Sequence, residues 1–141
     1  MTHPAPRAAL VTGAGGALGA AIAQALAGQG LRVLATDIDA AAAAATADAI
    51  GPSAIACRHD VTQETDWQSA LALAEAEFGA LGVLVNNAGI ATGGDFETVS
   101  LADWQATMAV SAQGVFLGCR MALPLLRRGA PAAIVNLGSA A

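Results

Sequence analysis

Short apolar runs alternate along the chain with longer segments of helical character. Each run is only a few residues long and rich in aliphatic side chains, which favours a buried strand over a buried helix. The runs expected to form strands are Ala8–Thr12, Leu31–Thr36, Ser53–Arg58, Val83–Val85 and Ala132–Leu137. The segments between them contain good helix formers. Helices are predicted over Ala17–Leu26, Ala40–Ile50, Gln63–Phe78, and from Ser100 or Asp103 to about Leu126.

Single residues add detail to three of these helices. In the first helix, Leu18, Ile22 and Leu26 recur at fourfold spacing and fall on one face. Thr62 is a candidate N-cap for the third helix. Pro124 lies in or near the last turn of the fourth helix, where its missing N–H should bend or end that helix.

Strands that alternate with helices imply parallel strands joined by right-handed crossovers, and hence a doubly wound α/β sheet. Ligands of such sheets bind at the carboxyl ends of the strands. The distinctive residues at or just after those ends are Gly13, Asp37, Asp60, Asn87 and Ser139. We therefore expect one crevice to bring together Gly19, Asp37, Asp60 and Asn87.

The most informative stretch is the glycine-rich turn between the first strand and the first helix. Its glycines are Gly13, Gly15, Gly16 and Gly19. They let the backbone bring N–H groups close to a phosphate, and a helix N-terminus adds partial positive charge. Asp37 ends the second strand, where dinucleotide-binding folds place an acid that binds a ribose hydroxyl. The strict G-x-G-x-x-G pattern fails at Leu18, so a turn without a ligand stays an alternative on this segment alone.

Composition and charge narrow the class of protein. The chain has 141 residues, 55% of them hydrophobic and 12% charged, with a net charge of −5, which suits one α/β domain. Its basic residues are all arginines and form no stripe, which argues against a nucleic-acid partner. Glycines interrupt the uncharged segment between Arg7 and Arg32, so neither a membrane span nor a secretory signal is expected there.

Cysteines and histidines give no sign of a metal site. Cys57 and Cys119 lie far apart in the sequence and have neither metal-ligand spacing nor a disulfide framework. His3 and His59 have no cysteine or acidic partners at ligand spacing. Two separate thiols suit a reducing compartment, so a cytoplasmic location is expected.

The order of these motifs resembles the short-chain dehydrogenase/reductase family. The motifs are TGAGGALG at 12–19, Asp37, Asp60-Val61, NNAG at 86–89 and NLGSAA at 136–141. The turn matches the T-G-x-x-x-G-x-G pattern of that family, with Ala17 in place of the middle glycine. The resemblance runs from Ala8 onward and covers only the N-terminal part of a family member. It implies a loose lead-in at 1–7 and an incomplete Rossmann-type NAD-binding domain over 8–141, with about five strands in the sheet.

The resemblance also implies roles for individual residues. Those in the turn that would hold the cofactor are Gly13, Gly15, Gly16, Ala17, Leu18 and Gly19. Those near the ribose and the adenine are Asp37, Ile38, Asp60 and Val61, and those lining the floor of the site are Asn87, Ala88 and Gly89. Ser139 matches the catalytic serine that hydrogen-bonds the substrate oxygen, and Ser111 stands where the family has an asparagine that holds a proton-relay water.

Charge favours NAD over NADP as the cofactor. Asp37 would accept hydrogen bonds from a free 2′-hydroxyl, whereas a 2′-phosphate would meet like charge. No arginine or lysine lies in the turn or just after Asp37 to neutralise that phosphate. The resemblance implies an NAD-dependent oxidoreductase, a dimer or tetramer, that interconverts a secondary alcohol and a ketone of small size.

One departure from the family decides what this chain should do by itself. The Tyr-x-x-x-Lys pair of the family supplies the general acid/base and lowers its pKa. The sequence contains no tyrosine and no lysine. The chain is therefore expected to be inactive alone, and truncation before that segment is the simplest explanation.

Two other functions stay open. A non-catalytic dinucleotide-binding or regulatory module would keep the cofactor residues and lack the chemistry. A methyltransferase also uses a glycine turn and an acid after the second strand, but NNAG and NLGSAA have no reason to occur there. On their residues alone, Asp60 is also a candidate helix-entry acid, Asn87 a partner for backbone groups, and Ser139 a helix N-cap.

Overall fold

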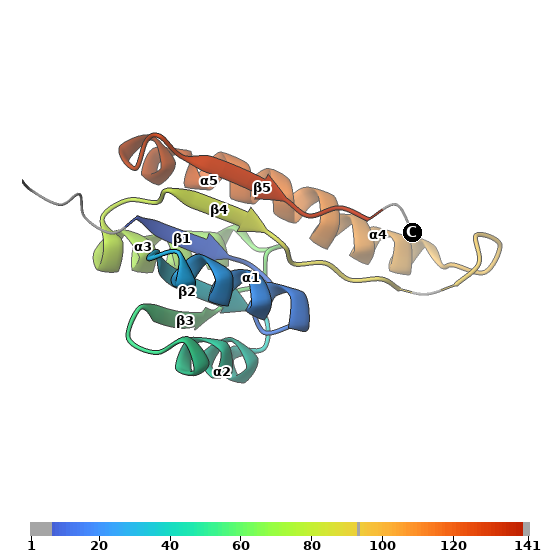
Figure 1. The fold of residues 1–141 in the computed structure, drawn as a ribbon. Coiled ribbons are helices and arrows are strands. Elements are labelled where there is room, and N and C mark those ends of the chain that lie inside the picture. The colour runs from blue at the N-terminus through green and yellow to red at the C-terminus, as the bar shows by residue number, and fades with distance from the viewer. Residues whose placement is uncertain (1–6, 93, 140–141) are drawn as a thin grey trace, which may run out of the picture.

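The central element of the fold is a parallel sheet with the strand order β3-β2-β1-β4-β5 (Figure 1). A computed structural model describes residues 7–92 and 94–139. The strands are β1 (Ala8–Val11), β2 (Arg32–Asp37), β3 (Ala54–Arg58), β4 (Val83–Asn86) and β5 (Ala133–Asn136). The strand order reverses between β1 and β4, the place where doubly wound sheets bind their ligands. The predicted Rossmann-type α/β fold is confirmed.

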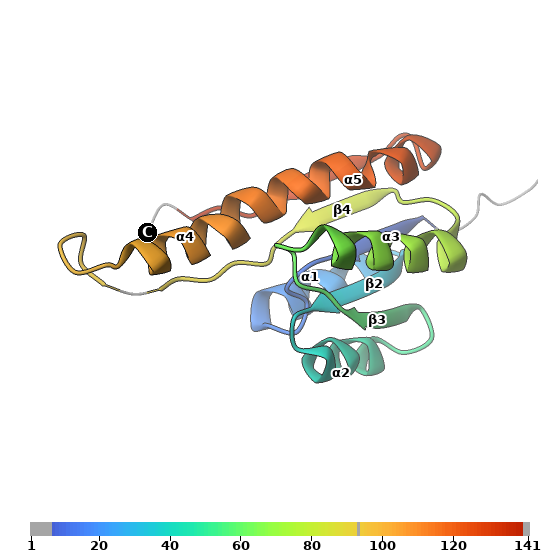
Figure 2. The ribbon, with the colours of Figure 1, turned by 180° about the vertical axis from the view of Figure 1, so that it is seen from behind.

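Helices cover both faces of this sheet. They are α1 (Ala17–Gly28), α2 (Ala40–Ile50), α3 (Glu64–Phe78), α4 (Leu101–Met108) and α5 (Gly114–Arg128), with a π-helical segment, Ala109–Gln113, between the last two. Figures 1 and 2 show α1 on one face and α3 with α5 on the other, while α4 projects past the carboxyl ends of the strands.

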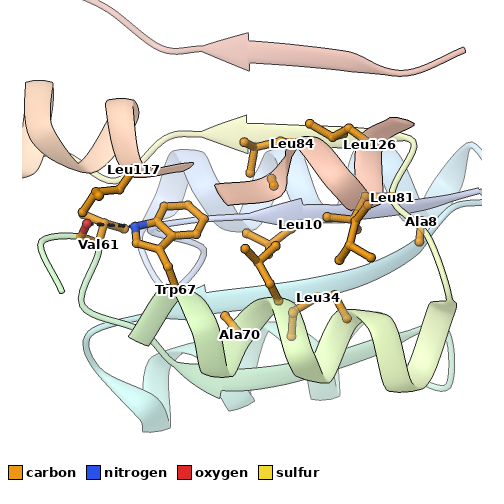
Figure 3. Close-up of a cluster of buried hydrophobic side chains, with 14 residues drawn as sticks. Ala8, Leu10, Leu34, Val61, Trp67, Ala70, Leu81, Leu84, Leu117 and Leu126 are labelled. Carbon is orange, nitrogen blue, oxygen red and sulfur yellow. Dashed lines mark hydrogen bonds between the residues drawn. The ribbon is translucent and has the colours of Figure 1, made fainter. Parts of the chain in front are cut away.

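The larger hydrophobic cluster fills the layer between the sheet and helices α3 and α5 (Figure 3). Leu10, Leu34 and Leu84 point into it from three neighbouring strands and are fully buried. Trp67 of α3 is also fully buried, and its indole N–H donates to the carbonyl of Val61 at 2.9 Å. Because the one polar atom of this side chain is satisfied, the whole indole can lie inside the apolar layer.

The second cluster lies on the opposite face, under α1 and α2, and its side chains are smaller. Val11, Val33 and Ala35 alternate with the leucines of the first face, as strand geometry requires. On α1 the buried residues are Gly19 and Ala23. The expectation of an apolar face with Leu18 in it is wrong for Leu18, which is 58% exposed. Small residues let α1 pack closely on the sheet, and this leaves Leu18 at the rim.

Of the two starts predicted for the fourth helix, Ser100 is the correct one, whereas the cap predicted at Thr62 is wrong. Ser100 caps α4, since its Oγ accepts the N–H of Asp103 at 3.0 Å. Thr62 does not cap α3, because that helix starts one residue later than predicted, at Glu64. Gln63 occupies the N-cap position, without a side-chain hydrogen bond. The Thr62 hydroxyl donates instead to the Asp60 carboxylate at 2.7 Å.

The fourth predicted helix is present but interrupted. Pro124 lies inside α5, which continues to Arg128, so proline does not end the helix where we expected. Leu101–Arg128 is, by length and composition alone, long and apolar enough to cross a membrane. Its α5 part packs against α3 and β4, as a core helix of an α/β domain does.

The two ends of the chain bear on two earlier expectations. Of the predicted lead-in over residues 1–7, only Arg7 is among the described residues, and the last two residues of NLGSAA lie outside them. At the edge of the sheet, all residues of β5 are exposed. Because β5 is also the last strand in the sheet order, it presents an open sheet edge.

Candidate functional site

A cavity of about 440 Å³ lies at the carboxyl ends of the strands, where the strand order reverses. The four residues expected to converge, Gly19, Asp37, Asp60 and Asn87, all line it. With them are the other predicted cofactor residues except Gly15, namely Gly13, Gly16, Ala17, Leu18, Ile38, Val61, Ala88 and Gly89. A cavity of this size lies in the range of small-molecule and cofactor sites.

The glycine turn forms one wall of the cavity and has no room for a side chain at Gly13 or Gly19. Gly13 has a φ of +62°, and a Cβ there would lie 2.8 Å from the Cα of Ala88. A Cβ on Gly19 would lie 2.1 Å from the carbonyl oxygen of Gly13. Gly16 is the N-cap of α1 without a side-chain bond, so the first N–H groups of the helix are left for a ligand.

The NNAG segment is fastened to this turn by hydrogen bonds. The Oγ1 of buried Thr12 accepts the N–H groups of Asn87 at 3.1 Å and Ala88 at 3.0 Å. In return, the Nδ2 of Asn87 donates to the carbonyls of Thr12 and Gly13 at 3.0 and 3.2 Å. Asn87 therefore satisfies backbone groups, as one alternative reading of the sequence held, and lines the cavity as well.

Asp37 is held at the end of β2 by backbone amides. Its Oδ2 accepts the N–H of Gly15 and its Oδ1 that of Asp39, both at 2.9 Å. Gly15 does not line the cavity, and a Cβ on it would lie 2.5 Å from that of Ala42. What Gly15 does here is fix the orientation of the Asp37 carboxylate.

Asp60 fits both interpretations that the sequence left open: it is an acid at the entry to a helix, and it lines the cavity. Its carboxylate accepts the N–H of Thr62 at 3.0 Å as well as the Thr62 hydroxyl, which is the bonding of a turn that leads into a helix. Its own N–H donates to Asp66 at 2.8 Å. Asp60 also lines the cavity, next to Val61.

His59 lines the cavity too, and sequence reasoning missed it. Only 2% of the residue is exposed, its Nδ1 lies 2.9 Å from the Thr36 hydroxyl, and its ring meets that of Trp67 edge-to-face at 4.2 Å. Burial lowers the pKa of the imidazole to about 4, against the smaller opposing effects of Asp66 and Asp60. The imidazole is therefore neutral at pH 7. Its place directly before Asp60 was the one available signal.

Apolar residues complete the lining of the cavity. Ile90 follows the NNAG segment, and Val110 belongs to the π-helical segment between α4 and α5. Val110 was not predicted, because periodicity in the sequence does not reveal a π-helical insertion. Among the described residues, no group of three or more histidine, cysteine or acidic side chains is placed to hold a metal ion.

Comparison with known proteins decides the family. The family model described as short chain dehydrogenase matches residues 7–141. The chain belongs to the short-chain dehydrogenase family. This is a family of oxidoreductases whose members bind a nicotinamide dinucleotide. The resemblance seen in the motifs of this chain is therefore confirmed.

Relatives within the short-chain dehydrogenase family are longer than this chain. It is 40% identical over 138 residues to D-threitol dehydrogenase of Mycolicibacterium smegmatis, covering 96% of this chain and 53% of the relative. It is 35% identical over 133 residues to 3-beta-hydroxysteroid dehydrogenase of Comamonas testosteroni, covering 94% and 52%. The chain thus spans about half the length of the curated relatives it matches.

A solved structure supports the same fold. The 3-ketoacyl-(acyl-carrier-protein) reductase from Brucella melitensis complexed with NADH superposes with a TM-score of 0.90 at 32% identity. The match covers 96% of this chain and 58% of that one.

The two serines predicted to serve catalysis in a short-chain dehydrogenase lie apart from the cavity lining. Ser111, in the π-helical segment, and Ser139, after β5, are both exposed, and neither lines the cavity. Val110, the neighbour of Ser111, does line it. The structure therefore brings together the predicted cofactor residues and does not bring the two serines among them.

Proposed function

We propose that this chain is the NAD-binding part of a short-chain dehydrogenase that interconverts a secondary alcohol and a ketone, and that it prefers NAD to NADP. The observation that supports the preference is the orientation of Asp37, whose carboxylate lines the cavity between two backbone amides. Among the described residues that line the cavity there is no arginine or lysine. A 2′-phosphate at Asp37 would face negative charge without a cation to compensate.

The cavity residues fit a dinucleotide in an orderly way. The glycine turn and the free N–H groups of α1 would hold the pyrophosphate, because that is where the backbone can approach an anion. Asp37 and Ile38 would contact the adenosine ribose, Asp60 and Val61 the adenine, and the NNAG segment the floor. When bound, the nicotinamide accepts or supplies a hydride.

The chemistry of the substrate oxygen involves residues of which this chain supplies only a part. In the proposed function Ser139 would hydrogen-bond that oxygen, and Ser111 would stand at the position of a proton-relay residue. The sequence contains no tyrosine or lysine to act as the acid/base pair. We therefore propose that the 141-residue chain binds the cofactor without turning over an alcohol.

The absence of tyrosine and lysine favours one second candidate, a non-catalytic dinucleotide-binding module. It would use the same cavity and the same Asp37. The two functions separate on the coding sequence downstream of Ala141: a Tyr-x-x-x-Lys about a dozen residues past Ser139 supports the enzyme, and a stop codon supports the module.

Isothermal titration of the chain with NAD and with NADP tests the cofactor proposal. Wild type is expected to bind NAD roughly tenfold to a hundredfold more tightly, since an unfavourable charge interaction of about 1.4 to 2.7 kcal/mol carries that factor. Asp37→Ala is expected to lose most of this difference. Asp48→Ala, which removes an exposed acid on α2, is the control and should keep it. Equal affinities in wild type, or an unchanged preference in Asp37→Ala, would contradict the proposal.

A further inference from the structure

Thr46 is a buried polar residue that neither the motifs nor the cavity lining accounts for. It lies on α2 within an alanine-rich run and is only 6% exposed. A threonine inside a helix usually donates to the carbonyl four residues earlier. Here the hydroxyl lies 3.3 Å from that carbonyl, of Ala42, and 2.7 Å from the carbonyl of Ala14 in the glycine turn. A hydroxyl has one proton, and the shorter contact identifies Ala14 as its acceptor.

The acceptor belongs to the same peptide unit that holds Asp37. The carbonyl of Ala14 and the N–H of Gly15 are the two ends of one planar peptide bond. Thr46 binds the carbonyl end, and the Oδ2 of Asp37 accepts from the N–H end at 2.9 Å. Because the peptide is planar, fixing the carbonyl also fixes the direction in which the N–H points.

From this geometry we propose that Thr46 is a positioning residue for the cofactor site: through the Ala14–Gly15 peptide it fixes the Asp37 carboxylate, and thereby the discrimination between NAD and NADP. The proposal rests on the proposed function, in which Asp37 faces the adenosine ribose. Thr46 lies on α2 and does not line the cavity, so it acts on the cofactor only through Asp37.

The local backbone makes such a clamp necessary. Gly15 and Gly16 follow Ala14 directly, and glycine populates many backbone conformations, so the chain itself does not fix the orientation of this peptide. The N–H of Ala14 is anchored to the carbonyl of Thr36 at 2.9 Å, but this bond belongs to the preceding peptide and does not by itself orient the Ala14–Gly15 peptide. Without the hydroxyl of Thr46 the buried carbonyl would lose its partner, and rotation toward another donor would withdraw the Gly15 N–H from Asp37.

The same helix holds the other carboxylate oxygen of Asp37. The N–H of Asp39 donates to Oδ1, and the Asp39 side chain caps α2 by accepting the N–H of Ala42 at 3.1 Å. The N-cap of α2 thus holds Oδ1 directly, and Thr46 in the second turn of the same helix acts on Oδ2 through the Ala14–Gly15 peptide. Removing the Thr46 hydroxyl leaves the Oδ1 contact in place and releases Oδ2 only.

The test uses the full 141-residue chain and the variants Thr46→Val, Thr46→Ala and Thr46→Ser. Thr46→Val keeps the shape and removes the hydroxyl, Thr46→Ala removes it with a smaller side chain, and Thr46→Ser restores it. Thr65→Val is the matched control, because it makes the same change at an exposed position of α3. Dissociation constants for NADH and NADPH are measured by nicotinamide fluorescence, and exchange of the Gly15 amide is measured by NMR without cofactor.

Thr46→Val and Thr46→Ala are expected to lower the ratio of NADPH to NADH dissociation constants by about three- to tenfold and to speed exchange of the Gly15 amide. Thr46→Ser and Thr65→Val should keep both values of wild type. In an Asp37→Ala background, Thr46→Val should leave the ratio unchanged, because the group through which it acts is gone.

The proposal is overturned if the hydroxyl-free variants leave the Gly15 exchange rate as in wild type, or if they weaken NADH and NADPH binding equally. A wild-type chain that binds the two cofactors equally overturns the proposed function instead. The Gly15 exchange rate, which needs no cofactor, separates these two failures.

Discussion

At the scale of single residues, the cavity is built by polar atoms that are already bound to backbone groups. Thr12, Asn87 and Asp37 each hold a neighbouring segment by hydrogen bonds of 2.9 to 3.2 Å. The sequence predicted Asp37 and Asn87 as site residues, because strand ends of a parallel sheet meet at one edge. It did not predict His59 or Thr46, because the partners of a buried side chain are set by packing between distant elements.

The buried His59 makes the stability of the fold depend on pH. In the unfolded chain its pKa is 6.5, and in the folded chain burial lowers that pKa to about 4. The unfolded state therefore binds the proton first as pH falls. The contribution of neutral His59 to the free energy of unfolding is therefore fully present above pH 6.5. It falls by on the order of 3 kcal/mol as the pH drops from 6.5 to 4.

Urea unfolding at pH 7 and pH 5 measures this effect. Wild type is expected to lose free energy of unfolding between the two, and His59→Gln should lose clearly less, since its side chain does not titrate. His3→Gln removes the other imidazole of the sequence and is the control. If the pH dependence of the free energy of unfolding disappeared in His3→Gln and persisted in His59→Gln, it would arise from His3, and the prediction would be wrong.

At the scale of elements, strands and helices were predicted well where hydrophobic period and turn residues agree. All five strands were found within a few residues of their predicted bounds. The interruption at Ala109–Gln113 was not, because nothing in its residues distinguishes a π-helical segment from the helices on either side. The failed cap at Thr62 has a local cause: its hydroxyl is taken by Asp60.

The contact between α5 and the sheet depends on one small residue, Gly118. A Cβ there would lie 2.5 Å from the Oδ1 of Asn86 and 2.7 Å from the indole of Trp67, both buried. Gly118→Ala is therefore expected to lower the free energy of unfolding by about 1–3 kcal/mol, as overpacking does.

Urea unfolding followed by Trp fluorescence checks this expectation. Gly28→Ala in α1 is the matched control, because a Cβ there meets nothing within 4 Å, and it should leave stability equal or slightly higher. An unchanged midpoint in Gly118→Ala would mean that α5 can shift outward without cost.

At the scale of the whole molecule, β5 is the more exposed of the two edge strands, since all of its residues are exposed whereas those of β3 are mostly half-buried. Ile134, Val135 and Leu137 are 39%, 46% and 40% exposed along the sheet edge. An open edge strand with apolar side chains is a template for pairing with a second chain. We expect the 141-residue chain to self-associate as its concentration rises.

Sedimentation velocity over a range of concentrations tests this expectation. Val135→Lys places a charge on the edge strand and should shift the chain toward the monomer. Thr65→Lys adds the same charge on the exposed face of α3 and should not. If wild type and Val135→Lys associated equally, the contact between two chains would not involve β5, and the expectation would be wrong.

The glycine turn is tied to β2, to the residue that follows β4 and to α2 by hydrogen bonds between groups of the protein itself. A dinucleotide that reaches this rim would meet loops whose ordering entropy was lost when the chain folded. The affinity for the dinucleotide would then depend on the contacts that it makes. Mutations that loosen the turn would weaken binding because the loop would have to be ordered again on binding, even though no contact with the ligand is deleted.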